Sequence, residues 1–239
     1  MVEEIAIIVP VHNEAGNVVR LAREIREVAS CSGLNYSLVF VDDASTDATW
    51  QQILEAHRGD SNVRGLKHAS NAGQSAALWT GFQNVKAPIL ATMDGDRQND
   101  PADLPQFLKA LEGVDFVCGW RKSRNDNWVR RVSSVIARFA RKVALGSDFK
   151  DTGCAMRVFR SGCLNALFPF NGLHRFMPIL VKSGGYQTLE IPVNHRARIS
   201  GNSKYGIWNR VWRGIFDLLA MAWYARRRLP ASMLCDTIP

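Results

Sequence analysis

The sequence predicts an α/β domain whose central sheet is mostly parallel, with helices on both faces. Between residues 5 and 120, short apolar runs alternate with segments that have the apolar period of a helix. Such alternation is typical of repeated strand–helix–strand units. The runs IAIIVPV (5–11) and PILATM (88–93) contain no charged residue, as expected of strands that are buried on both faces.

The expected elements follow one another in a regular order. After the strand at 5–11, a helix opens near Asn13 and keeps Val18, Leu21, Ile25 and Val28 on one face. Further strands are expected at 37–43, 63–67, 88–93 and 114–120. Further helices are expected at 47–57, 73–85 and 101–112, the last opening with Pro101, a favourable first-turn residue.

The alternation loosens after Trp120. The expected elements there are a basic helical segment (127–145), a turn that leads into a strand (151–160), a helix (171–184), a strand (186–195), a basic loop (196–206) and a last helix (207–229). No internal repeat and no linker rich in Pro or Gly divides the chain. We therefore expect one domain over 1–205, an amphipathic helix over 206–229 and a tail over 230–239.

Charge is unevenly divided along the 239 residues, whose formal net charge is +8. Residues 1–118 hold nine Lys and Arg against sixteen Asp and Glu, whereas residues 119–239 hold twenty-one against six. This asymmetry indicates that one half handles a cation and the other faces anions. A solvated basic surface is the alternative.

Several other classes of protein are not expected. The five cysteines form no CxxC pair, which indicates a reduced, cytosolic setting. The five histidines have no HxxxH spacing, so we do not expect zinc. The N-terminus MVEEIAIIVP does not have the pattern of a signal peptide, and no uncharged apolar run reaches the length of a membrane-spanning helix.

Four acids, Asp94, Asp96, Asp100 and Asp103, gather directly after the strand at 88–93. Like charges this close destabilise a fold unless a cation or hydrogen bonds offset them. In an open parallel sheet, ligands bind outside the carboxyl ends of the strands. The second strand delivers Asp42-Asp43 to that edge.

Helix caps or turns are the preferred interpretation of some of these acids. We assign that role to Asp43, Asp47, Asp100 and Asp103. One cap cannot use both Asp94 and Asp96, so these two need another explanation.

Asp94-Gly95-Asp96 is a hard-oxygen site suited to Mg²⁺ or Mn²⁺. Such ions commonly take one or two carboxylates and complete their shell with water and substrate phosphates. Gln98 adds a neutral oxygen two residues further on. GxGxxG and GxxxxGK[ST] are both missing, so phosphates must be bound by a metal and by basic side chains.

The chain contains a set of ordered motifs, which are IIVPVHNEAGNV, VDDASTDAT, NAGQSAALWTGF, MDGDRQNDP and CGWR. With these motifs the chain resembles the family-2 glycosyltransferases of the GT-A fold. The later segments DTGCAMRVFR, NGLHRFMPIL and IPVNHRARISGNSKYG narrow the resemblance to the polyprenyl-phosphate sugar synthases, the dolichyl-phosphate mannose synthase group and its bacterial relatives. The resemblance covers roughly residues 4–228.

The resemblance implies an inverting enzyme that moves one sugar from a UDP- or GDP-sugar to a polyprenyl phosphate. It would work at the cytosolic face of a membrane, peripherally bound, with Mg²⁺ or Mn²⁺ as cofactor. The missing QxxRW signature favours a single transfer over polymerisation. Which sugar and which base are used stays open, with UDP-glucose, UDP-galactose, a UDP-uronic acid and GDP-mannose as the choices.

The same resemblance implies roles for single residues. Nucleotide contacts would come from Pro10, Val11, Glu14, Asp42, Asp94, Arg198 and Lys204. Metal ligands would be Asp96 and Gln98. The acceptor phosphate would be bound by Arg121, Arg130, Arg131 and Ser134. Catalysis would rest on Asp94, Asp96, Arg121 and Asp151. Where the family often has Tyr after VPV, this chain has His12.

A phosphate acceptor explains why a basic half is needed. A phosphate monoester has a second pKa of about 6 and is largely ionised at neutral pH, so it needs no general base. It needs positive charge, and Arg suits phosphate because it binds in a bidentate manner. Asp151 would orient a sugar hydroxyl or an arginine; a turn or N-cap role is the alternative.

Basic residues and tryptophans favour a membrane surface over nucleic acid. The basic cluster consists of Arg121, Lys122, Arg124, Arg130, Arg131, Arg138, Arg141 and Lys142. No nucleic-acid-binding module accompanies it. The helix at 207–229 has a Trp-rich apolar stripe with basic edges, which is typical of a helix lying in a membrane interface. Packing of this stripe on the core is the alternative.

Two rival functions stay open. A family-2 transferase with a soluble or saccharide acceptor would need a carboxylate base, which would make Asp151 indispensable. A non-catalytic basic module that binds membrane or nucleic acid would need neither Asp96 nor Gln98.

Overall fold

The computed structural model describes residues 4–122, 142–143, 146, 148–194, 196 and 207–227, with the backbone alone at 207–215 and 225. The strands are β1 (Ile5–Val11), β2 (Tyr36–Asp42), β3 (Val63–Lys67), β4 (Ile89–Thr92), β5 (Phe116–Arg121), β6 (Arg157–Arg160) and β7 (Thr188–Val193). The α-helices are α1 (Val18–Ser32), α2 (Thr49–Gly59), α3 (Gln74–Gln83), α4 (Leu104–Leu111), α6 (Leu173–Ser183) and α7 (Ile207–Arg227). The 3₁₀ helices in the described residues are η1 (Pro101–Asp103) and η2 (Ser161–Ala166).

All of these strands join one sheet, in the order β3-β2-β1-β4-β6-β5-β7. β6 pairs in antiparallel fashion with β4 and β5, and the other described pairings are parallel. The expectation of a mostly parallel sheet is confirmed. The reversed β6 brings residues just before Arg157 to the edge where the parallel strands end.

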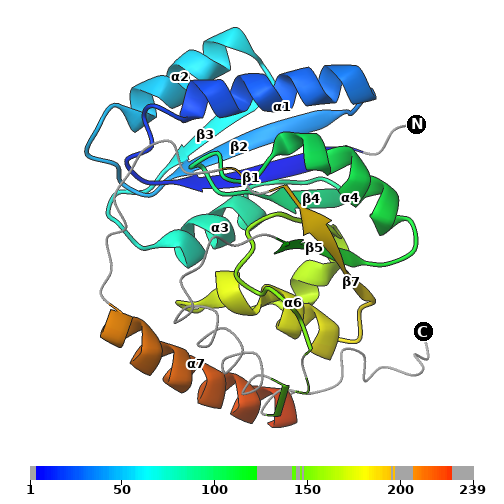
Figure 1. The fold of residues 1–239 in the computed structure, drawn as a ribbon. Helices are drawn as coiled ribbons and strands as arrows, with labels where there is room; N and C mark the ends of the chain where they lie inside the picture. The colour runs from blue at the N-terminus through cyan, green and yellow to red at the C-terminus, as the bar shows by residue number, and fades with distance from the viewer. Residues whose placement is uncertain are drawn as a thin grey trace, which may run out of the picture.

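Two apolar layers cover the sheet because successive strand residues point to opposite faces. Ile5, Ile7 and Val9 of β1 pack with α1, α2 and α4, whereas Ala6 and Ile8 pack with α3 and α6. Figure 1 shows these helices on the two sides of the sheet. Helices on both faces are therefore confirmed. The turns that follow β1, β2 and β4 lie at the carboxyl edge of the sheet, between these two layers of helices.

The last helix packs against the region around α6. Met221 and Ala222 are buried, and the ring of Tyr224 lies 4.5 Å from that of Phe168. Arg175 on α6 donates a hydrogen bond of 2.9 Å to Asp217. The expected stripe is thus divided, since part of it packs on the domain. In the part of the chain that the structure describes, no helix is long and apolar enough to cross a membrane.

Candidate active site

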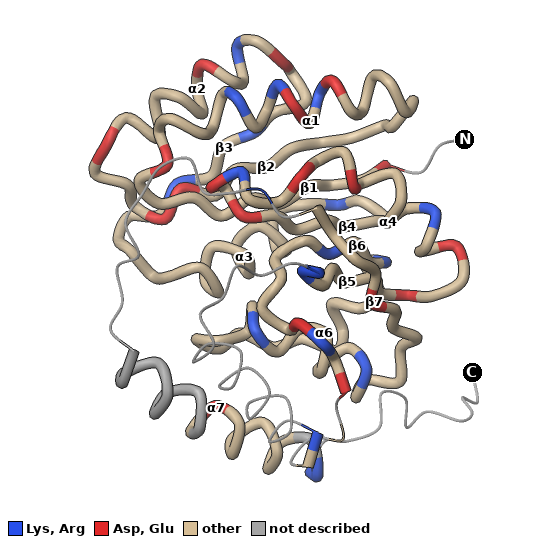
Figure 2. The backbone as a smooth tube through the Cα atoms, in the orientation of Figure 1, with Lys and Arg blue, Asp and Glu red and all other residues tan. Residues whose placement is uncertain are grey.

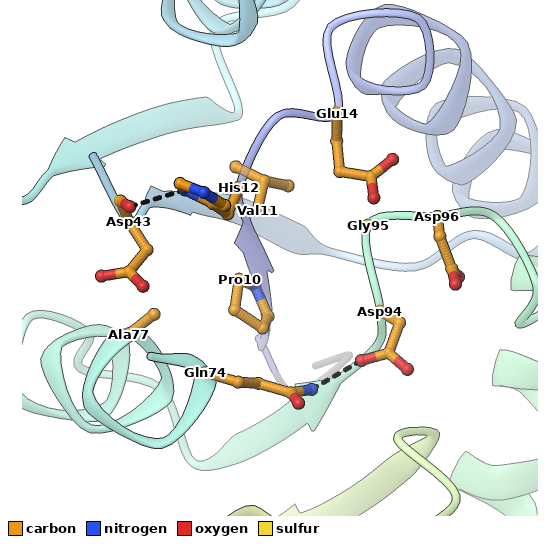
Figure 3. A pocket seen from close by; sticks show the side chains of 10 residues that line it. All are labelled: Pro10, Val11, His12, Glu14, Asp43, Gln74, Ala77, Asp94, Gly95 and Asp96. Carbon is orange, nitrogen blue, oxygen red and sulfur yellow. Dashed lines mark hydrogen bonds between the residues drawn. The ribbon is translucent and has the colours of Figure 1, made fainter. Parts of the chain in front are cut away.

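A cleft of about 300 Å³ opens at the carboxyl edge of the sheet (Figure 3). The ends of β1, β2 and β4 and the first turns of α3 form its walls. Its lining residues are Pro10, Val11, His12, Glu14, Asp43, Gln74, Ala77, Asp94, Gly95 and Asp96. Five residues expected at the nucleotide and metal therefore meet in one place: Pro10, Val11, Glu14, Asp94 and Asp96.

A tight turn after β4 carries the two acids of the Asp-Gly-Asp motif. The Asp94 N–H donates to Asn99 Oδ1 at 3.1 Å, and the Gln98 N–H donates to Asp96 Oδ1 at 3.1 Å. Arg97, which lies between Asp96 and Gln98, has a φ of 62°, in the left-handed region that non-glycine residues seldom adopt. The turn thus presents both carboxylates beside the end of β1.

Gly95 allows this turn to lie against β1. A Cβ atom at position 95 would stand 2.5 Å from Val11 Cγ1 and 3.3 Å from the Pro10 carbonyl oxygen. Both neighbours belong to the buried end of a central strand, so neither can move away easily. The glycine in the motif is therefore explained by close approach of two backbones.

Replacing Gly95 with alanine is expected to destabilise the protein by about 1–3 kcal/mol, the usual cost of overpacking. Urea denaturation measures this. Gly16→Ala is the matched control, because among the described residues, its two chain neighbours apart, no atom lies within 4 Å of a Cβ built there. Equal unfolding free energies for the two variants would contradict the close-approach explanation.

Asp94 lies in an environment that disfavours its charge. Burial raises the pKa of Asp94 to about 6, and the like charge of Asp96 adds to the shift, while Arg157 and Arg121 oppose it. Gln74 at the start of α3 donates a hydrogen bond of 2.8 Å to Asp94 Oδ1 (Figure 3). A bound cation would relieve the repulsion between the two carboxylates.

Asp43 holds the loop that leads into α3. Its carboxylate accepts hydrogen bonds from the N–H groups of Ala72 (2.8 Å) and Gly73 (2.7 Å), and it pairs with His68 at 2.7 Å. Burial raises the pKa of Asp43, but these partners outweigh it and hold the pKa below its ordinary value. Through this loop Asp43 fixes the position of Gln74.

His12 faces the cleft from the end of β1. Its Nδ1 lies 2.9 Å from the Asp43 carbonyl oxygen and 3.2 Å from the Asn71 amide nitrogen. The Asn71 amide also donates to that carbonyl, at 3.2 Å. These bonds fix the ring that stands where the family often has Tyr.

Asp42 is fully buried and does not line the cleft. Its Oδ1 accepts a hydrogen bond of 2.9 Å from the Ser45 N–H. Its Oδ2 has no hydrogen-bond partner among the described residues. An unsatisfied buried oxygen is costly, so a donor supplied by a ligand would stabilise it. The expected contact between Asp42 and a nucleoside stays a prediction.

Arg121 and Asp151 form a bidentate ion pair near the cleft. Arg121 Nε donates to Asp151 Oδ2 at 2.6 Å, and the Nη2 atom donates to Oδ1 at 2.9 Å. The Gly153 N–H also donates to Asp151 Oδ1, at 3.1 Å. The pKa of Arg121 is raised because its pairing with Asp151 outweighs burial. Asp151 thus holds an arginine and also accepts a turn hydrogen bond from Gly153, so both expected roles are present in the structure.

A buried arginine lies behind the acidic turn. Arg157 of β6 is 2% exposed and donates to the carbonyl oxygens of Thr152 (3.1 Å) and His174 (2.7 Å). Arg157 pairs with Thr92 in the β4–β6 register, and Thr92 lies two residues before Asp94. Its positive charge acts on Asp94 from inside the domain.

Sequence reasoning gave no role to Gln74, Asp43 or Arg157 in this site. Gln74 opens a helix at the same sheet edge, and Arg157 stands in an otherwise apolar strand pattern, CAMRVF. An arginine in such a run is a usable signal of a buried polar role, because unpaired charge is rarely buried.

The expected caps have mixed outcomes. Asp100 accepts from the Ala102 N–H at 3.0 Å, and Asp47 accepts from the Thr49 N–H at 2.9 Å, so these two predictions are confirmed. The cap prediction is wrong for Asp43, which holds the loop before α3. It is also wrong for Asp103, which accepts two bonds from Asn194 after β7.

Other expected site residues lie elsewhere or outside the described residues. Gln98 neighbours Asp96 but does not line the cleft. Outside the described residues lie Arg130, Arg131, Ser134, Arg198 and Lys204. Most of the basic helix expected at 127–145 lies outside them as well. Figure 2 nevertheless shows Lys and Arg outnumbering Asp and Glu along the described chain after β5.

The donor set at the acidic turn fits a hard divalent cation. Within the described ranges, no three His, Cys, Asp or Glu side chains are grouped as a complete metal cage. Asp94 and Asp96 at one cleft match the pattern in which Mg²⁺ or Mn²⁺ takes one or two carboxylates and leaves positions for phosphate and water. The residues present therefore fit such an ion bound together with a diphosphate.

Solved glycosyltransferases have a similar fold. Glucosyl-3-phosphoglycerate synthase from Mycobacterium tuberculosis matches with a TM-score of 0.68 and 17% identity, over 95% of this chain and 80% of that chain. Mannosyl-3-phosphoglycerate synthase from Rubrobacter xylanophilus matches with a TM-score of 0.66 and 14% identity, over 99% and 79%. At these identities the likeness concerns the fold, which is the GT-A fold of nucleotide-sugar transferases.

Sequence comparison gives the family. Residues 6–168 match the model of glycosyl transferase family 2, and the chain belongs to this family. Undecaprenyl-phosphate 4-deoxy-4-formamido-L-arabinose transferase from Edwardsiella ictaluri is 34% identical, over 86% of this chain and 64% of that protein. Dodecaprenyl-phosphate galacturonate synthase from Rhizobium johnstonii is 33% identical, over 93% and 68%. The chain thus spans about two thirds of the length of these relatives.

Proposed function

We propose that this protein is an inverting glycosyltransferase that moves one sugar from a nucleotide diphosphate sugar to a polyprenyl phosphate. The observation that carries the proposal is the acidic turn at the cleft, with Arg121 and Arg157 acting on Asp94 from nearby. Acids suit a metal-bound diphosphate, and Arg121 suits a second phosphate, whereas Arg157 is buried and offsets the charge of Asp94 from inside the domain. Relatives named for transfer to undecaprenyl and dodecaprenyl phosphate support this acceptor.

The reaction needs positioning more than proton transfer. An oxygen of the acceptor phosphate attacks the anomeric carbon, and the bond from that carbon to the donor diphosphate breaks. The bonding electron pair leaves on the diphosphate, and attack from the opposite side inverts the centre. The acceptor is already ionised, so no proton has to be removed.

The chain's own groups would divide the work between two anions. Arg121, held by Asp151, would meet a phosphate with a fixed guanidinium. Asp94, fixed by Gln74, would face the donor sugar. Asp96, with Gln98 beside it, would hold Mg²⁺ or Mn²⁺, which when bound offsets the charge developing on the leaving diphosphate. The M. tuberculosis synthase of similar fold was crystallised with Mn²⁺ and UDP, which supports this cofactor and favours a UDP-sugar.

We further propose that α7 rests on the cytosolic membrane surface, which gives peripheral attachment. Phe216, Leu219 and Trp223 lie on one side of the helix and are 67%, 60% and 64% exposed. Arg226 and Arg227 follow and are exposed as well. An apolar face flanked by basic residues suits anionic lipid headgroups.

Trp223→Ser is expected to weaken binding to vesicles that contain anionic lipid by about 10- to 100-fold, because burying a large apolar side chain contributes about 1.5–3 kcal/mol. Co-sedimentation with the vesicles measures it. Leu54→Ser on α2 is the control, since Leu54 is also an exposed apolar residue, at 40%. Equal binding by both variants would remove α7 from the proposed membrane contact.

The experiment that tests the function combines labelled UDP- and GDP-sugars, Mn²⁺ and undecaprenyl phosphate in detergent with the purified protein. We expect one sugar to appear on the lipid, with an anomeric configuration opposite to the donor's by NMR. Transfer to a saccharide or a soluble acceptor, with none to the lipid phosphate, would refute the proposed acceptor.

A further inference from the structure

A chain of ion pairs outside the cleft contacts the acidic turn, which is the turn after β4 that carries Asp94 and Asp96. It consists of Arg97, Glu24, Arg196 and Asp100, in the order of contact, and we call it the clamp. Arg97 pairs with one carboxylate oxygen of Glu24, and Arg196 donates to the other at 2.6 Å. Arg196 also donates to both oxygens of Asp100, at 2.7 and 3.2 Å.

The clamp holds the turn on both sides of Gln98. Arg97 precedes Gln98, and Asp100 follows it. The backbone N–H of Arg196 also donates to the Gln98 carbonyl oxygen at 3.0 Å. Three points of the turn are therefore tied to partners that are distant in sequence.

Glu24 connects the ion pairs of the clamp to helix α1. It lies on α1, whose neighbouring residues Leu21 and Ile25 are fully buried against the sheet. Its carboxylate is shared by two arginines and is 22% exposed, so solvent screens the pairs only in part. A φ of 62° is unfavourable in conformational free energy for a non-glycine residue such as Arg97, and the ion pair with Glu24 helps to hold the residue there.

We propose that Glu24 is a positioning residue for the reaction: through Arg97 and Arg196 it fixes the turn that presents Asp96 and Gln98 to a divalent cation. This inference rests on the proposed function. Glu24 touches no substrate in this role. It sets the spacing of the turn, and groups that orient metal ligands commonly change metal affinity by about 10- to 100-fold when they are lost.

The test uses UDP and MnCl₂ as probes in calorimetric titrations of the full chain. Wild-type protein is expected to bind UDP more tightly when Mn²⁺ is present. In Glu24→Gln this gain from Mn²⁺ should fall by about tenfold, while UDP affinity without metal stays unchanged. Glu27→Gln is the matched control, because Glu27 is an exposed acid on the same helix. It should behave as wild type.

A second variant separates positioning from general damage to the fold. Glycine adopts positive φ without strain, so Arg97→Gly should make the turn depend less on Glu24. The loss caused by Glu24→Gln should therefore be smaller in the Arg97→Gly background than in wild type, which is a non-additive result. Thermal unfolding of each variant shows that the protein titrated is folded.

Three outcomes would overturn the inference. They are an unchanged Mn²⁺ gain in Glu24→Gln, an equal loss of UDP affinity with and without the metal, and strict additivity with Arg97→Gly. If wild-type protein itself shows no gain from Mn²⁺, the proposed metal-dependent function fails before Glu24 is tested. The two failures are thus distinguishable.

Discussion

Asp96→Asn is expected to lower kcat/KM for sugar transfer by about a thousandfold. A bound cation contributes several kcal/mol by offsetting charge on the departing diphosphate, and each 1.36 kcal/mol is about tenfold in rate. The amide keeps the shape of Asp96 but removes the charge that the cation needs. Initial rates at saturating Mn²⁺ measure the effect.

Stability measurements distinguish this loss from misfolding. Asp94 and Asp96 repel one another in the free protein, so Asp96→Asn should unfold at the same temperature as wild type or at a higher one. Glu112→Gln removes one negative charge from an exposed position in the same half of the chain and should leave the rate unchanged. Retention of Mn²⁺-dependent UDP binding by Asp96→Asn would contradict the proposed metal site.

Local patterns predicted the strands and the acidic turn well. The first strand was expected at 5–11 and is found there, and the strand expected at 37–43 is found at 36–42. Both are interior strands of the sheet, and burial on two faces requires a continuous apolar run, which is recognisable in the sequence. The Asp-Gly-Asp turn was equally visible, because both of its acids and its glycine are adjacent in sequence.

Contacts between distant residues explain what the sequence could not reveal. Asp43 was expected to cap a local helix, yet its partners Ala72 and Gly73 lie about thirty residues further on. The direction of β6 depends on pairing with β4 and β5, which no local pattern encodes. The clamp likewise joins Glu24 to Arg196 across 172 positions.

The last helix shows an intermediate case. Its apolar period correctly predicted a helix, and α7 spans Ile207–Arg227. Periodicity could not tell which apolar residues meet the domain and which meet solvent. Ala222 is buried whereas Trp223 next to it is exposed, because Tyr224 and Met221 turn one side of the helix toward the region around α6.

Asp151→Asn separates a phosphate acceptor from a hydroxyl acceptor. We expect a rate loss of about tenfold or less, because the substitution disturbs the orientation of Arg121 while no proton needs to be removed. A hydroxyl acceptor would need Asp151 as general base, and its loss would then cost about 10²- to 10⁴-fold.

The pH profile of the Asp151→Asn variant distinguishes a phosphate acceptor from a hydroxyl acceptor. For a phosphate acceptor, the rate should rise through a pKa of about 6 in wild type and in Asp151→Asn alike, because the acceptor phosphate and Asp94 both ionise in that range and neither ionisation is that of Asp151. A profile that becomes flat in Asp151→Asn would instead assign proton removal to Asp151 and would favour a saccharide acceptor.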